Sequence, residues 1–247
     1  MFTKNKAKLI KSLHEKKHRN ETGLFLVEGE KNVTELLVSD FIIDSLLVTK
    51  TFFEENNKLI ENKNITCDMV DQNEIEKVST LESNNAALAV VKQKENVSFE
   101  ISKNDLVIVL DDVRDPGNLG TIIRIADWYG IKNIIASETT ADFYNSKVIS
   151  ATKGSFMRVK VFYTDLSSFL SKTKLPVFGA FLEGENVHTV KFPKEGILLM
   201  GNESRGISEN IEKYVSKKIT IPSFGKAESL NVAIATAVIL DNWRRGI

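Results

Sequence analysis

The sequence has few of the residues from which disulfides and metal centres are built. Cys67 is its only cysteine, so a disulfide within the chain is impossible and a site made of thiolates is excluded. The histidines have no ligand-like companions; His14 and His18 could share a helix face at i, i+4, and we interpret them as surface residues. The sequence therefore predicts no metal centre.

Long hydrophobic runs and net charge are also missing. The longest apolar run, VAIATAVIL (232–240), is too short to span a bilayer, and the N-terminus has no apolar signal-peptide core. Lys plus Arg equals Asp plus Glu at 33 each, so the whole chain has no global attraction to nucleic acid. We expect a cytoplasmic, soluble protein without a membrane partner, and 247 residues suit one large domain or two modest ones.

The familiar nucleotide-binding signatures are absent as well. Neither half has a G-x-G-x-x-G after its first strand-like run, and no G-x-x-x-x-G-K-[ST] occurs. These absences weaken an NAD-type enzyme and leave no P-loop. A serine hydrolase would need a G-x-S-x-G elbow and a convincing histidine, and the sequence offers neither.

The local charge distribution is less even than the total. The first twenty residues contain one acidic residue, Glu15, and seven basic ones: Lys4, Lys6, Lys8, Lys11, Lys16, Lys17 and Arg19. This segment is either an RNA-facing surface or the solvated face of a terminal helix, and the sequence leaves both interpretations open.

Helix-like and strand-like stretches alternate along the chain, which predicts an α/β fold. The polar segment 94–105 separates a small α/β unit, residues 1–98, from a larger one, residues 99–247. In the larger unit, short apolar runs predict a parallel sheet covered on both faces, with ligands bound beyond the carboxyl ends of the strands. The expected strands are 106–111, 132–136, 157–162, 176–181, 197–200 and 217–221, and the expected helices are 119–129, 142–151, 165–172, 207–215 and 229–243.

Three polar, glycine-containing segments fall at such strand ends. The first, DPGNLGTIIR (115–124), places Asn118 and Arg124 less than two helical turns apart, so both could border one cleft. A guanidinium on a nearly all-apolar helix is costly unless it faces a cleft or an anion. The structural alternatives are a helix N-cap for Asn118 and a buried ion pair with Asp127 or Glu203 for Arg124.

The other two segments have the same character. In ILLMGNESRGIS (197–208) an apolar strand leads into Gly201 and Glu203, and glycine permits a ligand to approach the backbone closely. In ITIPSFGKAESLNVAIATAVIL (219–240) a helix is expected to start at Ser229, where free amides suit a polar ligand. An ordinary strand-to-helix turn and an N-cap at Ser229 are the alternatives.

Taken together and in this order, NLGTIIR (118–124), MGNESRG (200–206) and IPSFGKAESLNVAIATA (221–237) resemble the SpoU (TrmH-type) branch of the SPOUT superfamily of RNA 2′-O-ribose methyltransferases. The stretch 11–37 is similar to the small substrate-binding domain that often precedes the catalytic domain. The resemblance covers nearly the whole chain. It implies an α/β fold whose C-terminal part threads a trefoil knot, an arrangement that ordinary connection rules would not suggest.

The resemblance also implies S-adenosylmethionine as methyl donor and an RNA ribose 2′-hydroxyl as acceptor. The residues that match the family's polar active-site positions are Asn118, Arg124, Glu203, Ser229 and Asn231, and those that would cradle the donor through backbone groups are Gly201, Ile221 and Leu230. Arg124 would activate the hydroxyl. Because arginine is effectively always protonated in proteins, it acts either as an unusual base or as a positioning group, and both roles stay open.

By the same resemblance we expect rRNA rather than tRNA as substrate, and a homodimer. A second hypothesis is a non-catalytic RNA-binding or ribosome-assembly protein that retains the fold. The presence of Asn118, Arg124, Glu203 and the Ser229–Asn231 tripeptide favours the enzyme, because a protein freed from catalysis need not keep them all.

Overall fold

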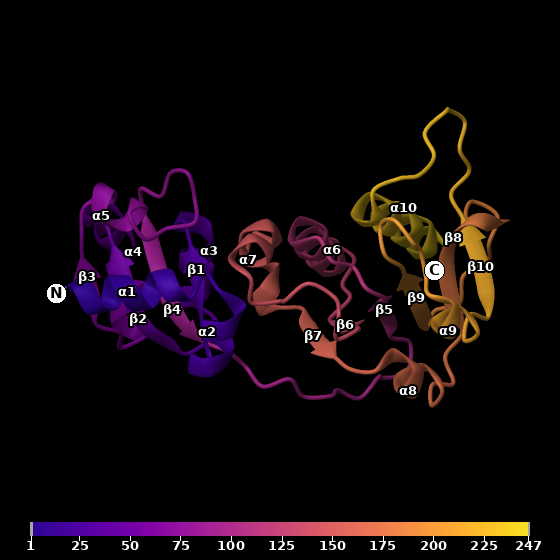
Figure 1. Ribbon diagram of the computed structural model, residues 1–247, viewed down its shortest axis with the longest axis horizontal. Helices are drawn as coiled ribbons and strands as arrows, with labels where there is room; N and C mark the ends of the chain where they lie inside the picture. Colours follow the sequence, from indigo (N-terminus) through magenta and orange to yellow (C-terminus); the bar gives the residue numbers. More distant parts are fainter. Residues whose placement is uncertain (1, 247) are drawn as a thin grey trace. The chain divides into compact units, whose positions relative to one another are not determined.

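The computed structural model describes residues 2–246, which group by their contacts into two compact units (Figure 1). One unit comprises Met1–Glu95 with Asp142–Met157, and the other comprises Asn96–Ala141 with Arg158–Ile247. Within the described residues, no helix has the length and apolar character needed to cross a membrane.

The first unit is built on a four-stranded sheet with the strand order β1-β4-β2-β3. Its strands are β1 Leu24–Glu28, β2 Ile43–Val48, β3 Cys67–Met69 and β4 Ala87–Lys92. β4 runs antiparallel to both of its neighbours, and β2 and β3 are parallel. The central strand β4 is apolar and buried at its first five residues, as expected for a strand that helices cover on both faces, whereas β2 has the exposed Asp44 and the half-buried Ser45 near its start.

The helices of this unit are α1 Lys4–Ser12, α2 Lys16–Thr22, α3 Glu30–Leu37, α4 Lys50–Asn62, α5 Gln72–Glu76 and α7 Ser146–Thr152, with a 3-10 turn at Ser155–Met157. A break separates α1 from α2, so His14 and His18 do not share one helix. The letters of HEKKH match the H-E-x-x-H zinc motif, but that motif needs both histidines on a continuous helix face. The expected shared face is therefore wrong.

The core of this unit includes a cluster of aromatic rings. The Phe25 ring lies against Phe41, Tyr144 and Phe156, with centroids 4.6–6.2 Å apart. Edge-to-face and tilted contacts of this kind add to the stability gained from burial. They join the segment 142–157 to β1, although more than a hundred residues of sequence separate them.

The second unit contains the predicted parallel sheet, which is confirmed with six strands in the order β10-β8-β9-β5-β6-β7. Its strands are β5 Leu106–Leu110, β6 Asn133–Ala136, β7 Lys160–Tyr163, β8 Val177–Asn186, β9 Gly196–Met200 and β10 Lys217–Thr220. All pairings are parallel. The central strands β5 and β9 are buried at every position, which explains their uninterrupted apolar sequences.

The helices of the second unit are α6 Pro116–Trp128, α8 Leu166–Leu170, α9 Glu209–Glu212 and α10 Val232–Arg245. α6 begins three residues before the expected start, because Pro116 occupies the first helical position and Asp115 is the N-cap. α10 begins three residues after the expected start, because Asn231 rather than Ser229 caps it. α6 and α10 pack against each other and bring the first and third motifs together.

Candidate active site

The first motif starts where β5 ends. The Asp115 side chain accepts a 2.8 Å hydrogen bond from the backbone N–H of Asn118 and so caps α6. The alternative that Asn118 itself is the N-cap is therefore wrong. With the helix end already satisfied, the Asn118 side chain is free for other contacts.

Asn118 joins the three motifs. Its Nδ2 donates a hydrogen bond to Glu203 Oε1 at 2.9 Å, and its Oδ1 accepts one from Asn231 Nδ2 at 2.8 Å. Asn231 Oδ1 in turn accepts from the N–H groups of Ala233 and Ile234 at the start of α10. Three of the predicted site residues therefore form one hydrogen-bonded chain at the carboxyl-end side of the sheet.

The second motif forms a tight turn directly after β9. Asn202 and Gly206 exchange two backbone hydrogen bonds, of 3.0 and 2.9 Å, and close the loop between them. Gly201 is buried beneath this turn, and a Cβ added there would lie 2.2 Å from the carbonyl carbon of Gly206. The site thus requires glycine at 201 for the close approach of two backbone segments.

Arg124 lies on the exposed side of α6, in a stripe with Gly117 and Thr121. It makes no hydrogen bond and no ion pair with any residue in the range 2–246. Asp127, one of the two expected ion-pair partners, binds Arg158 instead. The alternative of a buried ion pair is therefore wrong, and the guanidinium is open to solvent.

The third motif begins in a loop, residues 221–231, which Figure 1 shows extending away from β10, and it continues into the start of α10. Ile221 is half-buried, Ser229 is exposed, and Leu230 is 49% exposed. Between 223 and 231, no backbone N–H donates a hydrogen bond within the described chain. Unpaired amides beside apolar side chains are what a cofactor held mainly by backbone contacts needs.

The structure therefore brings together only part of the predicted site. Asn118, Glu203 and Asn231 are hydrogen-bonded, and Gly201 belongs to the same turn as Glu203. Among the described residues, no hydrogen bond links Arg124, Ser229, Ile221 or Leu230 to that chain.

A second polar cluster, which no pattern in the sequence predicts, lies beside this site. The Asp112 carboxylate binds Arg114 through Nε at 2.7 Å and Arg205 through Nη2 at 2.8 Å. Burial raises the Asp112 pKa, but hydrogen bonds from Arg114 and Thr139 and the charges of both arginines outweigh burial, and the net pKa is lowered. No pattern in the sequence indicates this contact, because Arg205 follows Asp112 by 93 residues.

The basic N-terminal segment is only partly available to a ligand. Arg19 is 2% exposed, and its guanidinium binds Asp142 and two backbone carbonyls. Lys6 binds the buried Asp68 at 2.6 Å. For the buried Arg19 the RNA-facing interpretation is wrong, whereas the Lys6 side chain is paired but still 43% exposed. Lys4, Lys8, Lys11, Lys16 and Lys17 are exposed.

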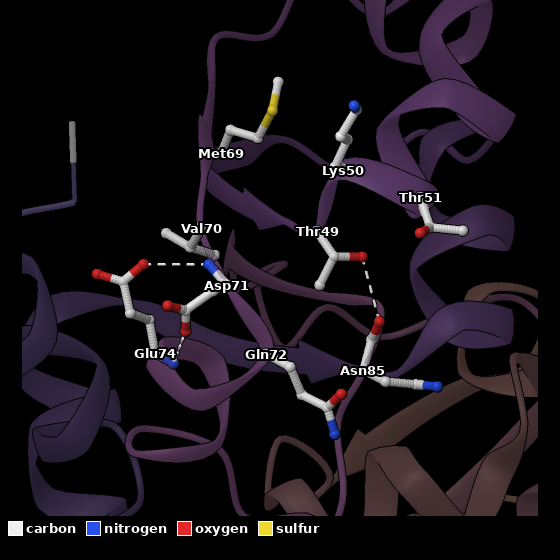
Figure 2. Close-up of a pocket in the computed structure, with 9 residues that line it drawn as sticks. All are labelled: Thr49, Lys50, Thr51, Met69, Val70, Asp71, Gln72, Glu74 and Asn85. Carbon is white, nitrogen blue, oxygen red and sulfur yellow. Dashed lines mark hydrogen bonds between the residues drawn. The ribbon is translucent and has the colours of Figure 1, made fainter.

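The first unit also contains an open pocket of about 560 Å³ near the starts of α4 and α5 (Figure 2). Thr49 and Asn85 lie on one side, where the Thr49 hydroxyl donates to the Asn85 carbonyl at 3.1 Å, and Asp71 and Glu74 form a capping box on the other. These groups bond one another, and none of the predicted site residues lines the pocket.

Comparison with family models gives two matches that together span most of the chain. The model of the SpoU rRNA methylase family matches residues 105–241, and the model of the MRM3-like substrate binding domain matches residues 4–89. The first match alone covers more than half of the sequence and contains all three motifs.

Individual relatives agree with the family models. The 23S rRNA (guanosine(2553)-2′-O)-methyltransferase RlmP of Bacillus subtilis (strain 168) is 31% identical over 245 residues, which are 97% of this chain and 96% of that protein. The AdoMet-bound rRNA methyltransferase from Sinorhizobium meliloti superposes with a TM-score of 0.87 at 29% identity, over 100% of this chain and 97% of that one.

The fold is shared more widely. AviRb, the SpoU methyltransferase from Streptomyces viridochromogenes solved with AdoMet, superposes with a TM-score of 0.88 at 22% identity, over 98% of each chain. The order of the motifs, the parallel sheet and these matches lead to one assignment. The chain belongs to the SpoU rRNA methylase family of the SPOUT superfamily.

Proposed function

We propose that this protein transfers a methyl group from S-adenosylmethionine to a ribose 2′-hydroxyl of rRNA. Family membership supports the reaction type, and the relatives that match over nearly the whole chain are named as rRNA methyltransferases. The observation that carries the proposal is the hydrogen-bonded chain Glu203–Asn118–Asn231, because it joins all three motifs at one place. Such convergence is what a site built from distant segments requires.

The donor site in this proposal consists of Gly201, Ile221 and Leu230. The unpaired backbone N–H groups of the loop 223–231 can donate hydrogen bonds to the acceptor nitrogens on the edge of the adenine base. The absence of a Cβ at Gly201 lets the adjacent turn stay compact. When bound, S-adenosylmethionine would supply an electrophilic methyl group on a sulfonium, whose sulfur leaves as a neutral thioether when the methyl group passes to oxygen. The protein's remaining task is mainly alignment of the acceptor hydroxyl.

We assign that alignment to Arg124 and to the amide chain. Arg124 has five N–H donors and no competing carboxylate within the described residues, so it can bind ribose or phosphate oxygens of the acceptor. The Ser229 hydroxyl is exposed and makes no hydrogen bond to the other described residues, so it can relay the proton that leaves the 2′-hydroxyl to solvent water. Asn118 holds Glu203 and Asn231 in fixed positions around this centre.

The wider organisation follows the same proposal. Residues 1–98 form the substrate-binding domain, and residues 99–247 form the methyltransferase domain with a trefoil knot, although the segment 142–157 groups by its contacts with the first unit. The protein works in the cytoplasm, where ribosomal RNA is found.

The active form in this proposal is a homodimer. Trp128 at the end of α6, 85% exposed, and Ile234 near the start of α10, 55% exposed, are large apolar side chains at opposite ends of two helices that pack together. Apolar side chains exposed along such a helix pair suit contact with a second copy. Sedimentation velocity at micromolar concentration tests this proposal, and a monomer would contradict it.

The decisive experiment for the activity has two measurements. Calorimetry with S-adenosylmethionine tests donor binding, and transfer of a labelled methyl group to 23S rRNA transcribed in vitro tests the reaction. Binding together with transfer supports the enzyme. A protein that binds rRNA but gives no heat with S-adenosylmethionine would instead be a non-catalytic RNA-binding or ribosome-assembly protein.

A further inference from the structure

Asp112 holds two exposed arginines side by side. Its Oδ1 accepts from Arg114 Nε, and its Oδ2 accepts from Arg205 Nη2. The carboxylate is 17% exposed, whereas the side chains of Arg114 and Arg205 are 60% and 68% exposed. One shielded negative charge therefore anchors two positive groups that face solvent.

Asp112 is itself fixed from several directions. Its backbone has φ +61°, a left-handed conformation that few residues other than glycine, asparagine and aspartate adopt. Its N–H donates to Ser137 Oγ at 2.9 Å, and its carbonyl accepts from Asn202 Nδ2 at 2.8 Å. Asn202 Oδ1 accepts from the N–H of Arg205 at 3.1 Å, so the backbone of that arginine is held by the same network.

Each guanidinium has most of its N–H groups available for a further hydrogen bond. A guanidinium has five N–H groups, and each of these arginines spends one on Asp112. Neither guanidinium makes any other hydrogen bond within residues 2–246. With one carboxylate between two cations, the cluster has a net positive charge and an open row of donors, which matches the oxygens of a phosphate.

The cluster lies directly beside the proposed active site. Asn202, which binds Asp112, precedes Glu203, and Glu203 binds Asn118. Arg114 precedes Asp115, the N-cap of α6. Arg205 is therefore two residues from Glu203 in the sequence, and Arg114 is next to the N-cap of the helix that carries Asn118.

A purely structural role explains these contacts poorly. An ion pair with an exposed arginine adds little to stability, because water and salt screen the guanidinium and ordering its long side chain costs entropy. Two arginines on one carboxylate also repel each other. An anion that binds both of them relieves that repulsion.

We propose that Arg114 and Arg205, held by Asp112, bind a backbone phosphate of the RNA beside the methylated nucleotide. This inference rests on the proposed function, because it takes RNA as the substrate. Arg114 and Arg205 supply the contacts, and Asp112 is a positioning residue. The site binds phosphate without reading the base, so it sets the register of the strand rather than the choice of sequence.

The first test is the double variant Arg114→Gln/Arg205→Gln, with filter binding of in vitro transcribed 23S rRNA over a series of salt concentrations. We expect roughly 10-fold or greater loss of affinity at low salt and a slope of log K against log salt smaller by about one. The matched control is Arg245→Gln, which removes an exposed, ion-paired arginine at the far end of α10. Unchanged affinity and slope in the double variant would overturn the proposal.

Calorimetry with S-adenosylmethionine separates this proposal from the proposed function. We expect the double variant to bind the donor within about twofold of the wild type, because the arginines lie outside the donor site. If the wild type binds rRNA without methylating it, the enzyme assignment fails, and the salt slopes still decide the phosphate site.

The second test is Asp112→Gly, which keeps both cations and suits the left-handed backbone. We expect an unchanged salt slope but a kcat/KM for rRNA methylation lower by roughly 3- to 10-fold, because the arginines lose their anchor. Wild-type kcat/KM in this variant would overturn the positioning role of Asp112.

Discussion

The side-chain amide of Asn118 donates a 2.9 Å hydrogen bond to the Glu203 carboxylate, across 85 residues of sequence. A carboxylate only accepts hydrogen bonds, so the NH₂ end of the amide faces Glu203 and the carbonyl end faces Asn231. Asn118 thus uses both ends of one small side chain to join the first, second and third motifs. This relationship makes the polarity of residue 118, and not only its size, important.

Replacing Asn118 by Asp tests that polarity. The variant places one carboxylate against another and removes the N–H group that donates to Glu203. The repulsion should displace the groups that align the acceptor, so we expect the rate of methyl transfer to fall roughly 100-fold. The affinity for S-adenosylmethionine should change far less. Initial rates with labelled S-adenosylmethionine and 23S rRNA measure the effect.

A compensating variant is the control for this prediction. In Asn118→Asp/Glu203→Gln the glutamine supplies the missing N–H, and we expect recovery of roughly 10-fold over the single variant. A single variant with wild-type turnover would show that the hydrogen bond has no part in the reaction.

Replacing Arg124 by Ala tests the acceptor side of the site. Arg124 is exposed and contacts no other described side chain through hydrogen bonds or ion pairs. The free energy of unfolding should therefore stay within about 0.5 kcal/mol of the wild type. Methylation should fall roughly 100- to 1,000-fold, since a donor aimed at the reacting oxygen is lost.

Two measurements accompany the Arg124 variant. Calorimetry should give unchanged S-adenosylmethionine binding, and Arg124→Lys, which keeps the charge but not the planar fork, should recover only part of the activity. Near-normal turnover of Arg124→Ala would remove Arg124 from the mechanism.

The sheet could be predicted from the sequence because its strands are local apolar runs. LVIVL in β5 and GILLM in β9 are buried at every residue, and burial of that kind leaves a readable pattern. The helix starts were less predictable. Asp115, Asn118, Ser229 and Asn231 are all plausible caps by residue type, and only the backbone geometry selects Asp115 and Asn231.

The sequence predicted the candidate site only for residues that lie in the three motifs, whose order along the chain resembles a known family. Asn118, Glu203 and Asn231 were expected together and are hydrogen-bonded to one another. The Asp112 cluster was not expected, because an ion pair between residues 93 positions apart has no periodicity and no fixed spacing. Arg19 was misread for a related reason: a charged residue near a terminus resembles a surface residue until the partner that lets it be buried, Asp142, is known.

Replacing Gly201 by Ala tests why glycine is needed after β9. The added Cβ would lie 2.2–2.5 Å from backbone atoms of Gly206 and Ile207, which cannot move as a flexible side chain could. We expect a loss of about 1–3 kcal/mol in the free energy of unfolding, together with weaker donor binding, because the turn next to the donor site must open.

Gly225 is the matched control for Gly201. It lies in the third-motif loop, and an added Cβ would meet no atom within 4 Å. Gly225→Ala should therefore leave the free energy of unfolding unchanged or slightly raised, by at most about 1 kcal/mol. Urea unfolding of both variants gives the comparison, and equal stabilities would show that the turn tolerates a side chain.

The free energy of unfolding should depend on pH in the alkaline range because of the ionisation of Tyr144. Burial raises the pKa of this phenol to about 12, and its hydroxyl both accepts from the N–H of Lys94, at 2.8 Å, and donates to the Lys94 carbonyl, at 3.2 Å. The unfolded chain has the ordinary tyrosine value of about 10, so folding favours the protonated form. The contribution to stability is therefore complete below about pH 10 and is lost as the pH rises toward 12.

Tyr144→Phe isolates this effect, because it should keep the ring contact with Phe25, whose centroid lies 4.6 Å away, and removes only the ionisable group. We expect the free energy of unfolding of the wild type, relative to this variant, to fall by up to about 2–3 kcal/mol between pH 10 and 12. Absorbance titration should show one of the four tyrosines ionising last in the wild type and missing from the variant. If all four ionise together near pH 10, the hydroxyl of Tyr144 is not buried in solution, and the packing of residues 142–157 on β1 would have to be revised.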